Sequence, residues 1–161
     1  MVAKSNQMMN LATELNQIVD DFSIRLSAIP DTEFSEKPSP TKWSKKEILG
    51  HLIDSAENNI RRFICGQYEV PAPKIKYNQD FWVSANRYQS VLDIDVITNW
   101  RVINLRICNV LSQMPAESFS KTCDFGDGKF LTLEWLAIDY VKHLKHHLNQ
   151  IIPKSFDIIY R

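Results

Sequence analysis

The sequence predicts an all-α fold and, within that class, a four-helix bundle. Three observations support this prediction: the 161 residues include only 4 glycines, apolar residues recur three and four positions apart over long segments, and these segments have short or modest connections. Globin-like packing of the same helices is the structural alternative. Because the chain has the length of one ordinary domain and contains neither a repeat nor a linker, we expect residues 1–161 to form a single bundle domain.

The first predicted helix runs from about Ser5 to Ala28. Its apolar positions have helical spacing, and the run Ile29-Pro30-Asp31 ends it. The segment that follows, Asp31 to Lys42, contains Pro38 and Pro40, so we predict a loop there.

The second predicted helix has the clearest start in the chain. The run Ser44-Lys45-Lys46-Glu47 is typical of a capping box, in which the side chains of the first and last residues bond to each other's backbone N–H groups. Trp43 and Ile48 flank this run as a hydrophobic staple. The helix is expected to end near Gly66.

Two further helices are predicted after an irregular segment between Val70 and Ser90, in which a short helix holds Phe81-Trp82. One covers Asp93 to Gln113, and the last covers Thr132 to Ile152, where Pro153 ends it. Between them, Phe119 to Leu131 is predicted to form a small β-hairpin, since Asp127-Gly128 is a favoured tight-turn pair.

The composition excludes several classes of partner. Hydrophobic residues make up 44% and charged residues 24%, as in a folded soluble protein. The 19 basic and 19 acidic side chains give no net charge, so no electrostatic footprint for nucleic acid or an anionic membrane is present. The sequence contains no run of about 18 apolar residues, so it predicts no membrane span. We therefore expect neither a nucleic-acid partner nor a membrane partner.

Three widely spaced cysteines, Cys65, Cys108 and Cys123, form no CxxC pair, which excludes a zinc ribbon or a redox motif. They are predicted to be small core residues. A sparse, odd set of cysteines and the lack of an apolar segment near Met1 together predict a cytoplasmic protein.

The histidines are the most informative residues, because three of the 4 lie at positions 143, 146 and 147. His143 and His147 are four residues apart on the apolar side of the last helix, with Cβ atoms about 5–6 Å apart, so both rings can reach one metal ion. His146 points further round, toward Asp139, Lys142 and Gln150, and we interpret it as an exposed or supporting group.

The remaining histidine, His51, lies on the second helix in line with Ser55, Asn59 and Arg62, a polar ridge suited to line a cavity. In a bundle, facing helices can bring His51 to the same point as His143 and His147. Three protein ligands leave coordination positions open, as in catalytic metal sites.

Less specific interpretations exist for each of these residues. A His-x-x-x-His pair often occurs by chance on a helix surface, and His51 alone is more often a hydrogen-bonded helix residue. The absence of His-Glu-x-x-His argues against a zincin-type metalloprotease. The four tryptophans are predicted to be packing residues rather than a ligand cage: Trp43, Trp82, Trp100 and Trp135.

Two motifs resemble the DinB-like superfamily, and most closely its YfiT-like branch of metal-dependent hydrolases. Trp43-Ser44 followed by residues 47–55 (EILGHLIDS) resembles the second-helix motif of that superfamily, and residues 131–134 (LTLE) with residues 139–151 resemble the last-helix motif. The resemblance covers nearly the whole chain. Segment 74–82 only partly resembles the branch, so the identity of the substrate does not follow.

The resemblance implies an up-down-down-up bundle in which one histidine of the second helix and two of the last hold a divalent metal, zinc or nickel. In this sequence these are His51, His143 and His147. It also implies a small-molecule substrate and a homodimer.

Three hypotheses for the function follow from different classes. The first is a hydrolase whose metal activates water against a small amide or ester, with Glu47, Asp54 and Asp139 as candidate catalytic carboxylates. The second is an S-transferase that uses a low-molecular-weight thiol such as bacillithiol. The third is a non-catalytic metal-binding stress protein.

Overall fold

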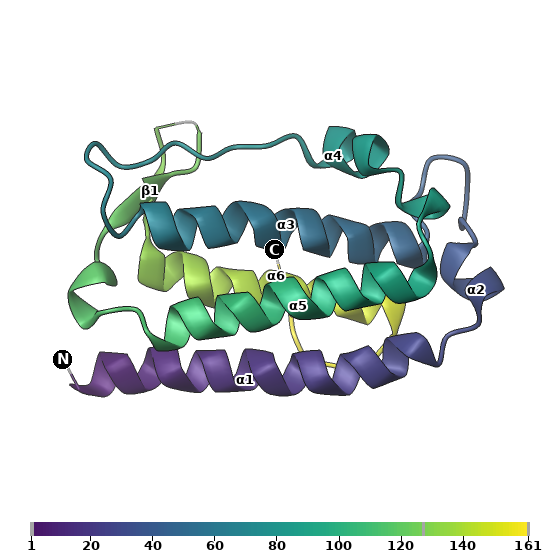
Figure 1. The fold of residues 1–161 in the computed structure, drawn as a ribbon, viewed down its shortest axis with the longest axis horizontal. Helices are drawn as coiled ribbons and strands as arrows, with labels where there is room; N and C mark the ends of the chain where they lie inside the picture. Colours follow the sequence, from purple (N-terminus) through teal and green to yellow (C-terminus); the bar gives the residue numbers. More distant parts are fainter. Residues whose placement is uncertain (1, 127, 161) are drawn as a thin grey trace.

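Four long helices form the body of the described part of the chain (Figure 1). The computed structural model describes residues 2–126 and 128–160, and these helices are α1 (Val2–Ser27), α3 (Lys45–Cys65), α5 (Asp93–Ser112) and α6 (Leu133–Ile151). α1 and α6 run in one direction and α3 and α5 in the other, because the segment between α3 and α5 returns along the length of the bundle (Figure 1). The predicted four-helix bundle of up-down-down-up type is therefore confirmed.

One prediction for the connections is wrong. The segment after α1 begins with a short helix, α2 (Asp31–Ser35), where a continuous loop was expected. Asp31 and Glu33 lie in its first turn, where carboxylates favour a helix start, and Phe34 is buried against the core. The two prolines at positions 38 and 40 lie beyond this helix, so they do not prevent it.

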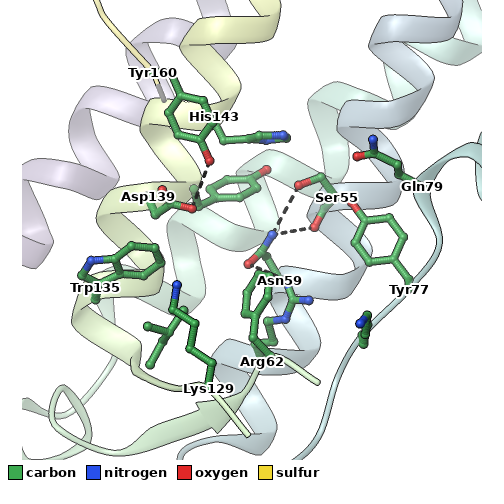
Figure 2. Close-up of a pocket in the computed structure, with 14 residues that line it drawn as sticks. Ser55, Asn59, Arg62, Tyr77, Gln79, Lys129, Trp135, Asp139, His143 and Tyr160 are labelled. Atoms are coloured by element: carbon green, nitrogen blue, oxygen red, sulfur yellow. Dashed lines mark hydrogen bonds between the residues drawn. The ribbon is translucent and has the colours of Figure 1, made fainter. Parts of the chain in front are cut away.

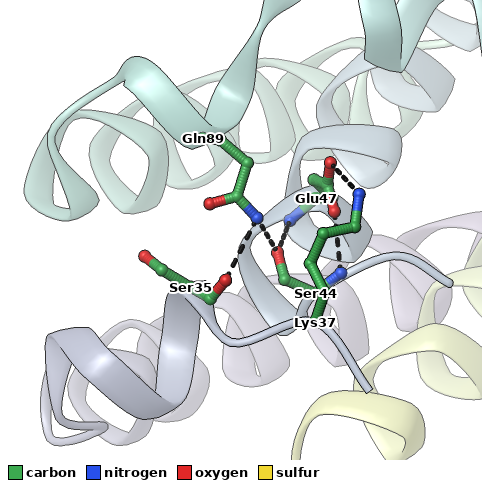
Figure 3. Close-up of polar contacts among 5 residues, drawn as sticks. All are labelled: Ser35, Lys37, Ser44, Glu47 and Gln89. Atoms are coloured by element: carbon green, nitrogen blue, oxygen red, sulfur yellow. Dashed lines mark hydrogen bonds and ion pairs between the residues drawn. The ribbon is translucent and has the colours of Figure 1, made fainter. Parts of the chain in front are cut away.

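The start of α3 is fixed by the predicted capping box (Figure 3). The Glu47 backbone N–H donates to Ser44 Oγ at 3.1 Å, and the Ser44 backbone N–H donates to Glu47 Oε2 at 2.8 Å. Gln89 donates to Ser44 Oγ at 2.7 Å, and Lys37 pairs with Glu47 at 2.9 Å. These contacts attach the chain on both sides of α3 to its first turn.

The short helix expected around Phe81-Trp82 is present as α4 (Gln79–Asn86) and is followed by the 3₁₀ turn η1 (Tyr88–Ser90). A second 3₁₀ turn, η2 (Ala116–Ser118), leads into an antiparallel hairpin of β1 (Thr122–Asp124) and β2 (Phe130–Thr132). Asp127 of the predicted turn lies outside the described residues, while Gly128 has a φ of 70°, which glycine adopts readily. The hairpin enters α6 directly, and Thr132 Oγ1 accepts from the Trp135 N–H at its start.

The core lies between the long helices. α1 packs against α5, and α3 packs against both α5 and α6. The largest fully buried apolar side chains come from all four long helices and from the segments that connect them: Leu15, Phe22, Leu26, Phe34, Leu49, Leu52, Phe63, Trp100, Ile107, Phe119 and Tyr140. Cys108 and Cys123 are buried and Cys65 is half-buried. Among the described residues, no helix combines the length and the hydropathy that a membrane span requires.

Candidate metal centre

Three imidazole rings meet between α3 and α6. His51 lies two turns into α3, and His143 and His147 lie one turn apart on α6, with ring centroids 4.5 Å from each other. The His51 centroid is 5.2 Å from that of His143 and 4.7 Å from that of His147. One nitrogen from each ring can be chosen so that all three lie within 4.8 Å of one another. The packing of α3 on α6 therefore brings the predicted set together.

Neighbouring groups orient two of these rings. His147 Nδ1 lies 2.8 Å from Gln150 Oε1, and because an amide oxygen only accepts, Nδ1 carries the proton and the Nε2 lone pair is available. The Nε2 atoms of His51 and His143 are 3.3 Å apart. The second ring nitrogen of His51 is buried and has no hydrogen-bond partner among the described residues. The Trp43 ring packs against His51, with centroids 5.1 Å apart.

Burial keeps the three rings neutral at pH 7. Loss of solvent lowers the pKa of His51 to about 4, with the neighbouring His147 adding to the effect. The pKa of His143 is also far below its usual range, first through burial and then through the other histidines. Burial lowers the pKa of His147 as well, partly opposed by its bond to Gln150. Neutral imidazoles are the form that binds a metal ion.

These residues fit a divalent ion. The Nε2 atoms of His51 and His143 are 3.3 Å apart, which is within the reach of two nitrogen ligands of one ion at about 2.0–2.1 Å each. Three nitrogen donors suit zinc-like and nickel-like ions and leave further coordination positions open. Among the described residues, no carboxylate or cysteine joins the three rings as a further ligand.

His146 lies beside the cluster and takes no part in it. Its Nε2 is 3.1 Å from Gln150 Nε2, its ring is 5.0 Å from that of His147, and it is half-buried. Gln150 therefore lies between His146 and His147 and connects the two rings.

A cavity of about 550 Å³ opens beside His143, bordered by α3, α6, the hairpin and the segment before α4 (Figure 2). The predicted polar ridge lines it: Asn59 donates to the Ser55 carbonyl oxygen at 2.9 Å and accepts from Arg62 Nη1 at 3.3 Å. The structure thus brings Ser55, Asn59 and Arg62 together in one wall, which continues toward the histidines.

The three candidate carboxylates have different positions. Glu47 belongs to the capping box of α3. Asp54 is fully buried, and its Oδ1 accepts from the Tyr88 hydroxyl at 2.6 Å and from the Asn86 side-chain amide at 2.8 Å. Only Asp139 lines the cavity, where its Oδ2 accepts from the Tyr160 hydroxyl at 3.3 Å. Burial raises the pKa of Asp139, and Tyr160 partly offsets this increase.

Several cavity residues were missed from the sequence. Trp135 was expected to be a packing residue, yet it is 46% exposed and forms a wall of the cavity. Tyr160, near the end of the chain, packs on both His143 and His146 with centroids 5.7 and 5.4 Å away. Lys129 and Tyr77 also line the cavity. Trp135 precedes Asp139 and His143 by four and eight residues on α6, so helix spacing could have indicated it. Tyr77, Lys129 and Tyr160 lie outside the helices and had no such signal.

Comparison with known proteins places this fold in a family. The model of the DinB superfamily matches residues 14–151. The chain belongs to the DinB superfamily. This DinB chain also resembles a solved structure described as "YfiT from Bacillus subtilis is a probable metal-dependent hydrolase with an unusual four-helix bundle topology". The two share 19% sequence identity with a TM-score of 0.74 over 91% of this chain and 83% of that one, which supports the bundle topology of this DinB member. No curated protein sequence matches the chain.

Proposed function

We propose that the protein is a metal-dependent hydrolase of small amides or esters, in which His51, His143 and His147 hold one divalent ion. The observation that carries this proposal is the meeting of three neutral imidazoles from α3 and α6 at the edge of a 550 Å³ cavity. The description of YfiT as a probable metal-dependent hydrolase supports it. Zinc and nickel are the ions that we expect, because both accept borderline nitrogen donors.

The residues around the cluster have separate tasks in this proposal. When bound, the ion supplies Lewis acidity, which polarises a carbonyl group and lowers the pKa of water. Gln150 holds the His147 ring with Nε2 turned to the cluster. Asp139 is our candidate for proton transfer, because it lines the cavity and its raised pKa lies closer to neutral pH than that of a solvated aspartate.

This proposal can be tested by assaying zinc-loaded and nickel-loaded protein against a panel of small amides and esters. We expect turnover of at least one substrate class that disappears on chelation and in His147→Ala, while His146→Ala retains most of it. Metal-loaded protein that hydrolyses no member of the panel would contradict the hydrolase assignment.

Thiol S-transfer is the second candidate, and the charge of the cavity favours it. Arg62, Lys76 and Lys129 line the cavity, and positive side chains lower the pKa of a nearby thiol. A low-molecular-weight thiol such as bacillithiol would then react as its thiolate. Conjugation of monochlorobimane with several thiols separates this candidate from hydrolysis. If metal removal lowers the melting temperature and neither assay shows turnover, a non-catalytic metal-binding role is the remaining interpretation.

A further inference from the structure

Arg62 carries a buried charge that its neighbours do not neutralise. The side chain is 2% exposed, and its Nη2 and Nε donate to the Ile75 carbonyl oxygen at 2.7 and 3.3 Å. Nη1 donates to Asn59 Oδ1 at 3.3 Å. Both acceptors are uncharged, and among the described residues Arg62 forms no ion pair with a carboxylate. Because arginine stays protonated even when buried, a full positive charge lies at the cavity wall.

An unpaired buried charge is unfavourable, so its retention needs a reason. Two of the five guanidinium N–H groups are not used by these contacts. The guanidinium also lies 4.0 Å from the centre of the Phe125 ring, which stabilises a cation but does not cancel its charge. An oxyanion in the cavity would use the remaining N–H groups and neutralise the charge.

Most of the other charged side chains in the cavity lining are also positive. Lys76 and Lys129 line it together with Arg62, and among the described residues the one carboxylate in its lining is Asp139. Asp139 lies one turn from His143 on α6 and is bonded to Tyr160. In Figure 2 the labelled Arg62 and Lys129 lie at the opposite end of the cavity from His143 and Tyr160. The charge is therefore arranged along the cavity, with its positive end away from the histidines.

The distance between the two ends sets the size of the ligand. Arg62 follows His51 by eleven residues on α3, which is about 16 Å along the helix axis. The cavity lining is partly apolar, with Trp135, Leu131 and Phe125 among its side chains. A ligand that reaches both ends therefore has several bonds between its charged group and the group near His143.

We propose that the cavity binds an amphipathic small anion, with a carboxylate or phosphate at Arg62 and Lys129 and an apolar body against Trp135 and Phe125. This inference rests on the proposed function only for the reaction at the histidine end. The substrate class is then anionic. The cavity should bind a charged head group more tightly than the neutral counterpart of that group.

Calorimetric titration with three probes that share a phenyl ring tests the proposal: 3-phenylpropionate, 2-phenylethyl phosphate and the neutral 3-phenylpropanamide. The titrations use the protein as purified and His147→Ala, in buffer of low ionic strength. We expect at least one of the two anions to bind about tenfold more tightly than the amide. The stronger of the two anions identifies the head group as carboxylate or phosphate.

Two adjacent arginines offer a matched pair of variants. Arg62→Gln should remove most of this tenfold preference, while Arg61→Gln, which changes an exposed side chain at the preceding position of α3, should leave it unchanged. Lys129→Gln, also at an exposed side chain, should reduce the preference several-fold and provides the test if Arg62→Gln proves unfolded by circular dichroism.

Equal affinities for the anions and the amide, binding of neither anion, or equal effects of Arg62→Gln and Arg61→Gln would overturn the proposal. A preference that persists in His147→Ala supports it even if no metal-dependent activity is found. Conversely, metal-dependent turnover of neutral substrates without any preference for an anion would leave the proposed function intact and contradict this inference.

Discussion

Burial shifts the pKa values of the imidazoles and of the carboxyl groups of this protein in opposite directions, because it favours the uncharged form of both. It lowers the pKa of His51, which leaves a nitrogen lone pair available to a metal ion. It raises the pKa of Asp54 to about 6, an increase that the hydrogen bond from Tyr88 partly opposes and the charge of Glu57 reinforces. A single physical effect thus keeps the imidazole of His51 neutral and makes Asp54 a pH-sensitive group.

Asp54 predicts a pH dependence of stability. Its pKa is about 6 in the folded protein and has an ordinary value of 3.8, so between these pH values the folded state holds a proton that the unfolded chain has released. The contribution of Asp54 to the free energy of unfolding therefore falls as the pH rises through this window, by up to about 3 kcal/mol. Asp54→Asn keeps an oxygen for Tyr88 and Asn86 but cannot ionise, so this decrease should disappear in the variant.

Urea denaturation of the wild type and Asp54→Asn at several pH values between 4 and 7 measures this difference. Glu117→Gln, which changes an exposed carboxylate in η2, serves as the control and should follow the wild type, whereas the charge of Glu57 contributes to the raised pKa of Asp54. Parallel pH curves for the wild type and Asp54→Asn would show that Asp54 is ionised throughout the window.

Asp139 predicts a separation between metal binding and turnover. If it transfers a proton, Asp139→Asn should lower kcat by about 10²–10³-fold, while the affinity for the metal changes little because Asp139 contacts Tyr160 and is not one of the three clustered residues. Steady-state kinetics and a metal titration on the same preparation measure both quantities. An unchanged kcat would remove Asp139 from the mechanism.

At the scale of the elements, the docking of η1 on α3 depends on Gly50. A Cβ atom at this position would lie 2.1 Å from Tyr88 Cδ2, well inside van der Waals contact. Gly50→Ala should therefore destabilise the protein by about 2 kcal/mol or more, although the same change in an open helix would stabilise it by roughly 1 kcal/mol.

The sign of this effect can be reversed by removing the neighbouring ring. In a Tyr88→Ala background the clash is absent, so the additional Gly50→Ala change should be neutral or stabilising. Chemical denaturation of the two single variants and the double variant gives the coupling directly. Additive effects would mean that Gly50 is constrained by something other than Tyr88.

The sequence predicts elements well where local chemistry determines them. The capping box at Ser44 and Glu47 and the stop near Gly66 define α3 to within a residue, because those signals act over one turn. α2 was missed because its five residues are held by the burial of Phe34, which is a tertiary effect. Helix spacing likewise predicts that His143 and His147 share a face, but it contains no information on the distance to His51.

At the scale of the whole molecule, the site depends on how α3 and α6 pack and on what covers them. The resemblance of two motifs to the DinB superfamily supplied the choice of His51, which the periodicity left open. The chain fold also returns Tyr160 to His143 and places Lys129 of the hairpin at the cavity, and neither approach has a local signal. These residues line the cavity, so the fold was more accessible from the sequence than the composition of the cavity wall.

A shared ion would also couple the two helices in folding. An ion that binds only the folded state stabilises it by about 2.7 kcal/mol at a free concentration one hundred times its dissociation constant. Addition of zinc or nickel to chelator-treated protein should therefore raise the melting temperature of the wild type and of His146→Ala, but not that of His51→Ala. An equal increase in all three proteins would indicate binding elsewhere.

Calorimetric titration of metal-free protein with zinc or nickel, compared between the wild type and His51→Ala, tests most directly whether residues of two helices hold one ion. We predict one ion per chain in the wild type and a loss of at least about a hundredfold in affinity in His51→Ala, because a ligand from α3 is removed while both histidines of α6 remain. Equal stoichiometry and affinity in the two proteins would contradict the three-histidine centre.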